Sequence, residues 1–190
     1  GISGKFSIPK GTLFSGSNAN GTFTFTTADT TTYFSSNTTY SVANLAIYEG
    51  SYMNDSYVVD YTNQTQRYIL SNPNIDITSL MINISENNGQ TNTIFNQVNT
   101  LYNLTPSSNV YFLQGAQNNQ YEILFGDGIL GRIPQNGAVV TVNYRIAQGP
   151  IADGISRFTC SKDLGSVNGG SATIASLVAS SNSSSGGIPE

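Results

Sequence analysis

The stretch "YEILFGDGILGRIPQNGAVVTVNYR", residues 121–145, alternates apolar and polar residues at both ends and is rich in glycine in its middle. Residues 121–125 and 138–146 have the period-two pattern of half-buried strands. In the second run one face carries Val140, Val142, Tyr144 and Ile146. Glycine, aspartate and proline between the runs are typical turn residues. The stretch therefore predicts two strands joined by a sharply bent connection.

The connection contains a candidate structural turn motif. Its eight residues are Phe125, Gly126, Asp127, Gly128, Gly131, Arg132, Pro134 and Gly137. Glycine adopts positive φ at little cost, and an aspartate side chain can accept hydrogen bonds from neighbouring backbone amides. A calcium loop would need several oxygen ligands at regular spacing, and a phosphate loop would need a longer glycine run with a lysine. The pattern therefore favours a turn, and we predict no catalytic, cofactor-binding or metal role here.

Short apolar or β-branched runs, broken by Gly, Asn, Pro and Ser every eight to twelve residues, occur along the rest of the chain, as expected of an all-β domain. Phe23 and Phe25 alternate with threonine. Further strands are predicted at 42–48, 56–61, 75–77, 80–84, 110–114 and 172–179, with a turn at 87–89. The sequence thus predicts a mainly β fold of short antiparallel strands and hairpins, with at most one or two short helices.

One segment has helical spacing. Apolar residues at three- and four-residue intervals, Ile94, Phe95, Val98, Leu101 and Tyr102, predict a helix before Pro106, although Asn and Thr are poor helix formers. We expect residues 1–180 to form the β-rich region, as one domain or as two with a division near 86–109. Residues 181–190, rich in Ser and Gly, have the composition of a linker.

Composition argues against several functional classes. Only 9% of the 190 residues are charged, against about 25% in typical soluble domains, and a net charge of −4 with seven Lys and Arg makes nucleic acid an unexpected partner. No apolar run reaches the roughly 20 residues of a membrane span, so no membrane association is expected. The absence of histidine removes the commonest general base, and we expect the protein not to be an enzyme. The single Cys160 is expected to be a half-buried apolar residue.

Other residue patterns leave alternatives open. Seven Asn-x-Ser/Thr triplets could accept glycans, but a chain this rich in Asn, Ser and Thr forms them by chance. Asp55 with Asp60, or Asp76 with Glu86, could pair as glycosidase carboxylates, although loop acids are the simpler interpretation. Eleven tyrosines could stack on sugars.

Residues 121–149 resemble the signature of the baseplate J-like family of contractile tails, in which strand, Phe-Gly-Asp-Gly, Gly-x-x-Pro, Gly and strand follow in that order. "IPKGTLFSG" (8–16) and "FTFTTAD" (23–29) resemble earlier elements of the family, and "SGGIPE" (185–190) resembles its join to a helical region. The motif "YEG" (48–50) resembles the version of this family that is found in T4-like phages. After "YRIAQG" the chain continues with "PIADGISRF" (150–158), where relatives commonly have a Gly-Asn-Val type sequence. The resemblance covers nearly the whole chain and is strongest over residues 110–149.

The resemblance implies a structural subunit of a phage baseplate wedge, which joins wedges into the ring around the tail hub. Its partners would be other wedge subunits, with a homodimer in the full-length protein, and its location the tail baseplate of a virion made in the host cytoplasm. It brings no catalytic residue and no cofactor. The sequence is also expected to be a piece that lacks an N-terminal region and a C-terminal helical region. The alternative is a viral sugar-binding or adhesin-like β domain.

Overall fold

The computed structural model describes residues 4–35, 41–160, 166–167, 170–171, 177–179 and 181–184. The fold is mainly β and its sheets are largely antiparallel, as predicted. Within the described part of the chain the only helical segments are two short 3₁₀ helices, η1 (Gln117–Asn119) and η2 (Gly149–Ala152).

The described residues form fifteen strands, most of them short. They are β1 (Gly4–Ile8), β2 (Leu13–Asn18), β3 (Gly21–Thr26), β4 (Thr31–Ser35), β5 (Tyr48–Glu49), β6 (Ser51–Val58), β7 (Tyr68–Ile69), β8 (Ile75–Glu86), β9 (Thr91–Gln97), β10 (Val110–Gly115), β11 (Tyr121–Phe125), β12 (Val139–Ile146), β13 (Phe158–Thr159), β14 (Ser166–Val167) and β15 (Gly170–Ser171). The strands predicted at 110–114, 121–125 and 138–146 are confirmed within one residue at each end.

The chain forms two compact units. Unit 1 combines residues 1–52 with residues 147–190, and unit 2 is residues 53–146. Unit 2 is therefore inserted in sequence between two segments of unit 1. The division falls at 52/53 and 146/147, whereas residues 86–109, where we considered an internal division, lie inside unit 2.

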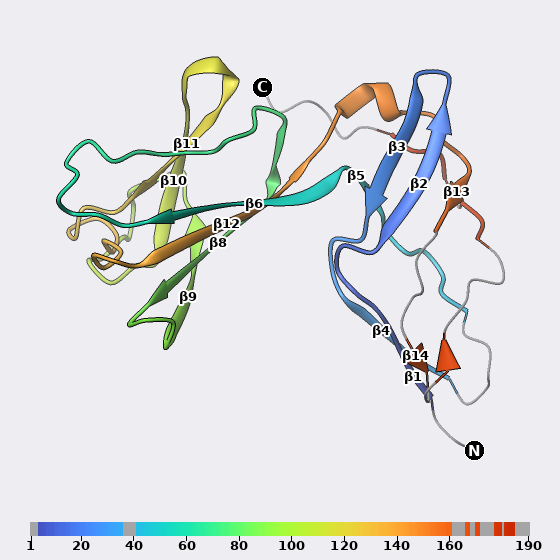
Figure 1. The fold of residues 1–190 in the computed structure, drawn as a ribbon, viewed down its shortest axis with the longest axis horizontal. Coiled ribbons are helices and arrows are strands. Elements are labelled where there is room, and N and C mark those ends of the chain that lie inside the picture. The colour runs from blue at the N-terminus through green and yellow to red at the C-terminus, as the bar shows by residue number, and fades with distance from the viewer. Residues whose placement is uncertain are drawn as a thin grey trace. The chain divides into compact units, whose positions relative to one another are not determined.

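Unit 1 contains a four-stranded sheet with the order β13-β2-β3-β5 and two smaller pairs, β1-β4 and β14-β15. Strands β2 and β3 form a hairpin (Figure 1). Its Phe14, Phe23 and Phe25 side chains lie in a core that also includes Ala152 and Ile155. The predicted aromatic face of Phe23 and Phe25 is thus confirmed. Cys160 is half-buried against this core, as expected.

Unit 2 is one seven-stranded sheet with the order β6-β12-β8-β9-β10-β11-β7 (Figure 1). The sheet curls, because its two edge strands approach each other. The Tyr57 hydroxyl of β6 donates to the Ile69 carbonyl of β7 (2.6 Å), and the Ser71 amide donates to the Asp55 carboxylate (2.8 Å). The curl encloses a core of fully buried side chains that includes Leu70, Ile82, Ile84, Phe95, Ile123, Val140, Val142 and Tyr144.

The predicted helix near residues 94–105 is wrong. Residues 91–97 form β9, which pairs antiparallel with β8 (Ile82 opposite Phe95) and parallel with β10. The Asn87–Gly89 turn, predicted correctly, has positive φ at all three residues and folds β9 back onto β8. Phe95 is buried, whereas Leu101 and Tyr102 are exposed, so the segment has no buried helical stripe. Strand pairing here overrides an apolar spacing carried by poor helix formers.

Three other expectations differ from the structure. The two strands predicted at 75–77 and 80–84 are one continuous strand, β8, whose register with β12 shifts between Asn143 and Arg145. The strand predicted at 42–48 is reduced to β5, and that at 56–61 lies earlier, as β6. Of the strand predicted at 172–179, residues 177–179 have no regular structure and 172–176 lie outside the described residues.

The predicted linker is anchored at its start. Ser183 exchanges backbone hydrogen bonds with Gly154 and Ile155 (both 2.8 Å), and its hydroxyl donates to the Ala152 carbonyl (2.7 Å). The remainder of the predicted linker, 185–190, which carries the "SGGIPE" element, lies outside the described residues.

Candidate functional site: the turn motif and the groove beside it

The turn motif is closed by direct contact between two glycines. A Cβ atom built on Gly126 would lie 2.2 Å from the Gly131 carbonyl carbon and 2.5 Å from its Cα. Gly131 has φ of +97° and donates its N–H to the Thr105 carbonyl (3.1 Å). The Gly128 N–H donates to the Gly131 carbonyl (3.0 Å). The backbone therefore approaches itself so closely that a side chain at position 126 does not fit.

Asp127 caps the turn. One carboxylate oxygen accepts the backbone N–H groups of Ile129 (2.9 Å) and Leu130 (2.8 Å). These hydrogen bonds, Leu130 first and then Ile129, lower the pKa of the Asp127 carboxyl below its ordinary value. Among the described residues no group of three or more His, Cys, Asp or Glu side chains is placed to hold a metal ion. The acid in the motif is thus a hydrogen-bond acceptor that shapes the loop.

We expect Gly128→Val to destabilise the protein more than Asp127→Asn. Gly128 has φ of +82°, and its Cβ would meet the Ile133 Cδ1 atom at 3.2 Å, so valine there is strained by about 1–3 kcal/mol. Asparagine at position 127 keeps an acceptor oxygen for the Ile129 and Leu130 amides. Thermal melts of wild type and both variants, with calcium and with chelator, test this. A calcium-dependent rise in melting temperature that is lost only in Asp127→Asn would contradict the turn interpretation.

Arg132 ties the motif to the end of β8. Both terminal nitrogens of its guanidinium donate to one oxygen of Glu86 (3.0 and 2.9 Å), and the Gln135 amide donates to the other oxygen (3.0 Å). The Glu86 side chain is only 2% exposed, and the guanidinium lies over the Phe95 ring, 5.2 Å from its centroid. This buried ion pair fixes the position of the loop against the sheet.

The last part of the motif joins the chain at residues 59–61. The Tyr61 hydroxyl donates to the Pro134 carbonyl (2.6 Å), and the Tyr61 amide donates to the Asn136 side chain (2.8 Å). The Gly137 N–H donates to the Val59 carbonyl (2.8 Å). At the other end of the motif, the Phe125 ring contacts the rings of Tyr68 and Phe95 edge-on, with centroids 5.2 and 5.6 Å apart. All eight motif residues therefore belong to one structural corner of unit 2.

The structure gives each of the four acids considered for catalysis its own partners. Asp55 accepts from Ser71 and from the Tyr144 hydroxyl, and Asp60 accepts from Thr62. Two of them form ion pairs, Asp76 with Arg145 and Glu86 with Arg132. All four acids are therefore hydrogen-bonded or ion-paired to other residues of unit 2.

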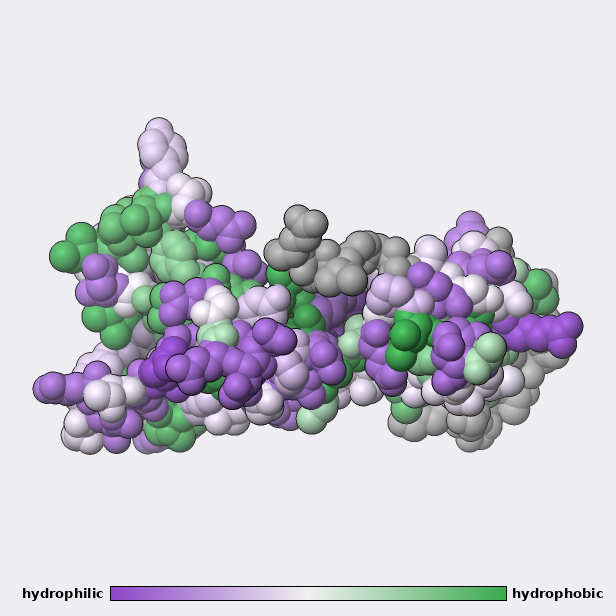
Figure 2. Space-filling model, turned by 90° about the horizontal axis from the view of Figure 1, so that it is seen from above, coloured by the Kyte–Doolittle hydropathy of each residue, from purple (hydrophilic) through white to green (hydrophobic). Residues whose placement is uncertain are grey.

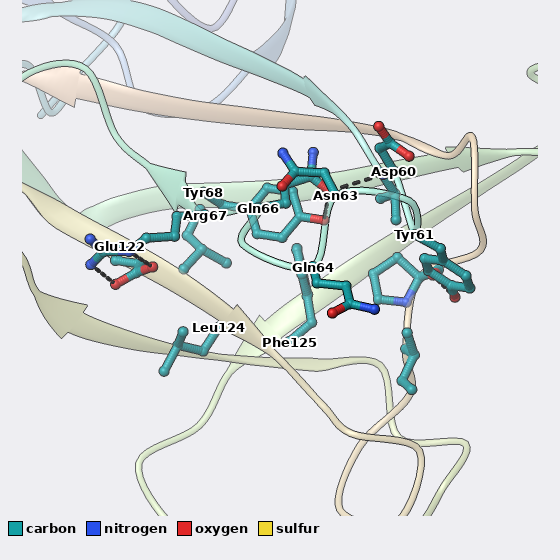
Figure 3. A pocket seen from close by; sticks show the side chains of 14 residues that line it. Asp60, Tyr61, Asn63, Gln64, Gln66, Arg67, Tyr68, Glu122, Leu124 and Phe125 are labelled. Atoms are coloured by element: carbon teal, nitrogen blue, oxygen red, sulfur yellow. Dashed lines mark hydrogen bonds and ion pairs between the residues drawn. The ribbon is translucent and has the colours of Figure 1, made fainter.

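A groove lies beside the corner. Its volume is about 580 Å³, and it runs between the chain of residues 59–68 and the end of β11. Apolar side chains that line it are Leu124, Phe125, Ile133 and Pro134, and polar ones are Asp60, Asn63, Gln64 and Gln66. Figure 3 shows Asp60 and Tyr61 at one end of the groove and the Arg67–Glu122 pair at the other. The sequence does not predict this groove. Its two walls are about 60 residues apart in the chain, and no local pattern connects them.

The Arg67–Glu122 pair fixes one end of the groove. Arg67 donates to both oxygens of Glu122 (2.7 and 2.6 Å), and Gln114 also donates to Glu122 (2.9 Å). The Glu122 side chain is 4% exposed and the Arg67 side chain 52% exposed. The Arg67 hydrogen bonds, followed by that of Gln114, outweigh burial and lower the pKa of the Glu122 carboxyl.

We expect this pair to make stability depend on acid pH. Because the pKa of Glu122 is lower in the folded than in the unfolded state, its contribution is fully present above the unfolded-state pKa and is lost as pH falls through the folded-state pKa. Arg67→Gln should flatten the decline in stability between about pH 6 and pH 3. Urea denaturation across that range measures it, with Arg157→Gln, at an exposed position, as the matched control. An equal acid decline in wild type and Arg67→Gln would refute the assignment.

Within the described residues, no helix is long and apolar enough to cross a bilayer. Compared with models of known protein families and with curated protein sequences, the chain matches neither. The resemblance to the baseplate J-like family thus remains a prediction from the motifs in residues 8–29 and 110–149.

Proposed function

We propose that the chain is a structural subunit of a phage contractile-tail baseplate wedge. In this role it helps to join wedges into the ring around the tail hub. Its partners are other wedge subunits, and two copies pair in the full-length protein. Its location is the tail baseplate of the virion.

The observation that supports this proposal best is what the turn motif does with its polar groups. Asp127 holds two backbone amides, Arg132 holds buried Glu86, and Gly126 and Gly131 touch through their backbones. Residues that make these contacts hold the shape of the loop. A fixed shape fits the assembly role that the resemblance to the baseplate J-like family implies.

The surface of unit 2 also suits assembly. Exposed large apolar side chains include Met53, Val58, Tyr61, Met81, Ile94, Ile129 and Ile133. In the space-filling view hydrophobic residues gather on part of this unit, at left (Figure 2). Apolar side chains clustered at a surface are a common feature of protein interfaces.

Localisation in the parent particle tests the proposal. Antibodies raised against these 190 residues, bound to intact phage and viewed by negative-stain electron microscopy, should label the tail end that carries the baseplate. Label on the capsid, or only at the tips of fibres, would overturn the proposal. Specific binding of the chain to a glycan array would favour the sugar-binding alternative.

A further inference from the structure

The edge of the unit 2 sheet is incomplete beside the turn motif. The register of β11 with β7 covers Glu122 and Ile123, and the Leu70 N–H donates to the Tyr121 carbonyl (2.8 Å). β11 then continues through Leu124 and Phe125 past the end of β7. Residues 60–66 leave the sheet edge through two turns, closed by the hydrogen bonds of Asn63 to Asp60 and of Gln66 to Asn63. No strand of the described part of the chain lies against Phe125 on that side.

The backbone of β11 presents hydrogen-bonding groups to this gap. In an antiparallel pair successive residues point their N–H and C=O groups alternately to the two neighbouring strands. The Tyr121 carbonyl points to the β7 side, and so therefore do the backbone groups of Ile123 and Phe125. Phe125 is the position where another strand residue could pair. An unpaired strand edge is a template for an added strand.

The groove occupies this gap and is already formed. Its wall is held by the Tyr61 hydroxyl on the Pro134 carbonyl (2.6 Å), and by the Gln66 side chain, which donates to the Val58 carbonyl (2.7 Å) and accepts from the Asp60 amide (2.9 Å). Its volume of about 580 Å³ is in the usual range for binding pockets. A ligand would therefore meet a prearranged surface.

The side chains of the groove indicate the chemistry of the occupant. Leu124 and Ile133 are 38% and 44% exposed, so aliphatic surface is open to contact. Arg67 and Glu122 neutralise each other at one end. Asp60, at the other end, accepts hydrogen bonds from Thr62 and from neighbouring backbone, and among the described residues no Lys or Arg forms an ion pair with its carboxylate. The uncompensated charge of the groove is thus one negative charge beside Tyr61 (Figure 3).

We propose that this groove receives an extended segment of a partner polypeptide that adds to the sheet beside Phe125. The segment is mainly aliphatic, sets a side chain on Leu124 and Ile133, and carries a basic residue at the end next to Asp60. The proposed segment runs in the direction of β7, antiparallel to β11, and its basic residue then lies toward its N-terminus. The inference rests on the proposed function in one respect: the assembly role makes another wedge subunit the protein that supplies the segment.

Titration with a short peptide, followed by amide NMR of the labelled chain, tests the proposal. The probe is the blocked peptide Ac-Lys-Val-Thr-Val-Thr-NH2. We expect saturable shifts confined to residues 61–67, 123–127 and 133–135, with a Kd of about 1 mM. Replacing the probe's Lys by Glu should weaken binding about two- to fivefold, the effect of one exposed ion pair. A probe with N-methylated valines, which cannot pair with a strand edge, should not bind.

Two variants locate the binding surface. Ile133→Lys should weaken binding of the probe about tenfold or more, since it places a charge on the apolar surface of the groove. Ile94→Lys, at a position 57% exposed on β9, should leave binding unchanged. The N-methylated probe tests the strand mode on the wild-type chain, so the result does not depend on how the variants fold.

The proposal is overturned if the probe gives no saturable shifts up to about 10 mM, well above the expected Kd. It is also overturned if Ile133→Lys and Ile94→Lys bind the probe peptide with equal affinity. A third contradicting result is that an oligosaccharide such as chitotriose shifts the amide signals of the groove while the peptide does not. None of these results bears on particle localisation, so failure of the groove and failure of the assembly role are distinguishable.

Discussion

Gly126→Ala is expected to destabilise unit 2 by about 3 kcal/mol or more, at the upper end of what overpacking by one methyl group costs. The added Cβ would lie 2.2–2.5 Å from three backbone atoms of Gly131. Backbone cannot rotate aside as a side chain can, and Gly131 is itself held by Thr105. Relief of the clash would therefore separate the two halves of the turn. Far-UV circular dichroism during urea denaturation measures the loss.

Gly115→Ala is the matched control. A Cβ at Gly115 meets nothing within 4 Å, and neither Gly115 nor Gly126 has positive φ, so the two substitutions differ only in steric contact. The control should stay within about 0.5 kcal/mol of wild type. Since the chain forms two compact units, peptide-resolved hydrogen exchange should place the loss for Gly126→Ala in residues 53–146. Equal stability of the two variants would show that the glycine contact is not as close as described.

The sequence predicts local structure here where a few residues decide it. Asn87, Asn88 and Gly89 all tolerate positive φ, and the turn they predict is present. The alternating residues of 121–125 and 138–146 likewise become β11 and β12. In each case the determining information lies within about ten residues of the chain.

Long-range arrangement is not readable in the same way. β8 pairs with β12 across more than 50 residues, and nothing in either strand identifies the other as its neighbour. The insertion of unit 2 into unit 1 likewise leaves no mark in composition at residues 52 or 147. The groove shares this property, since residues as far apart in the chain as Gln64 and Ile133 line it together.

Glu86 combines a local feature that the sequence predicts with a long-range contact that it does not. Alternation places it on the same face of β8 as Ile82 and Ile84, which predicts a carboxylate on the buried side of a strand. A buried carboxylate needs a partner, so the sequence indicates an ion pair at Glu86. From the sequence alone we consider this residue only as a possible catalytic acid or a loop acid. The partner, Arg132, was recognised as part of the turn motif, but their 46-residue separation hid the connection.

Arg132→Met is expected to destabilise unit 2 by about 3 kcal/mol, the low end of the cost of breaking a buried ion pair from one side. The variant leaves Glu86, 2% exposed, with the Gln135 amide as its remaining donor. The 26% exposure of the Arg132 side chain admits some water, which is why we expect the low end. Urea denaturation with a check that the m-value is unchanged measures the difference.

The double variant Arg132→Met with Glu86→Gln separates the cost of a stranded charge from the value of the pair. Glutamine removes the charge and keeps an oxygen for the Gln135 amide, so the double variant should lose only about 1 kcal/mol, the net worth of a hydrogen bond. Arg157→Met, which removes the same charge from an exposed position, should change stability by less than about 0.5 kcal/mol. If the double variant is as unstable as Arg132→Met alone, the arginine acts through its packing on Phe95, and the buried charge is not what makes it necessary.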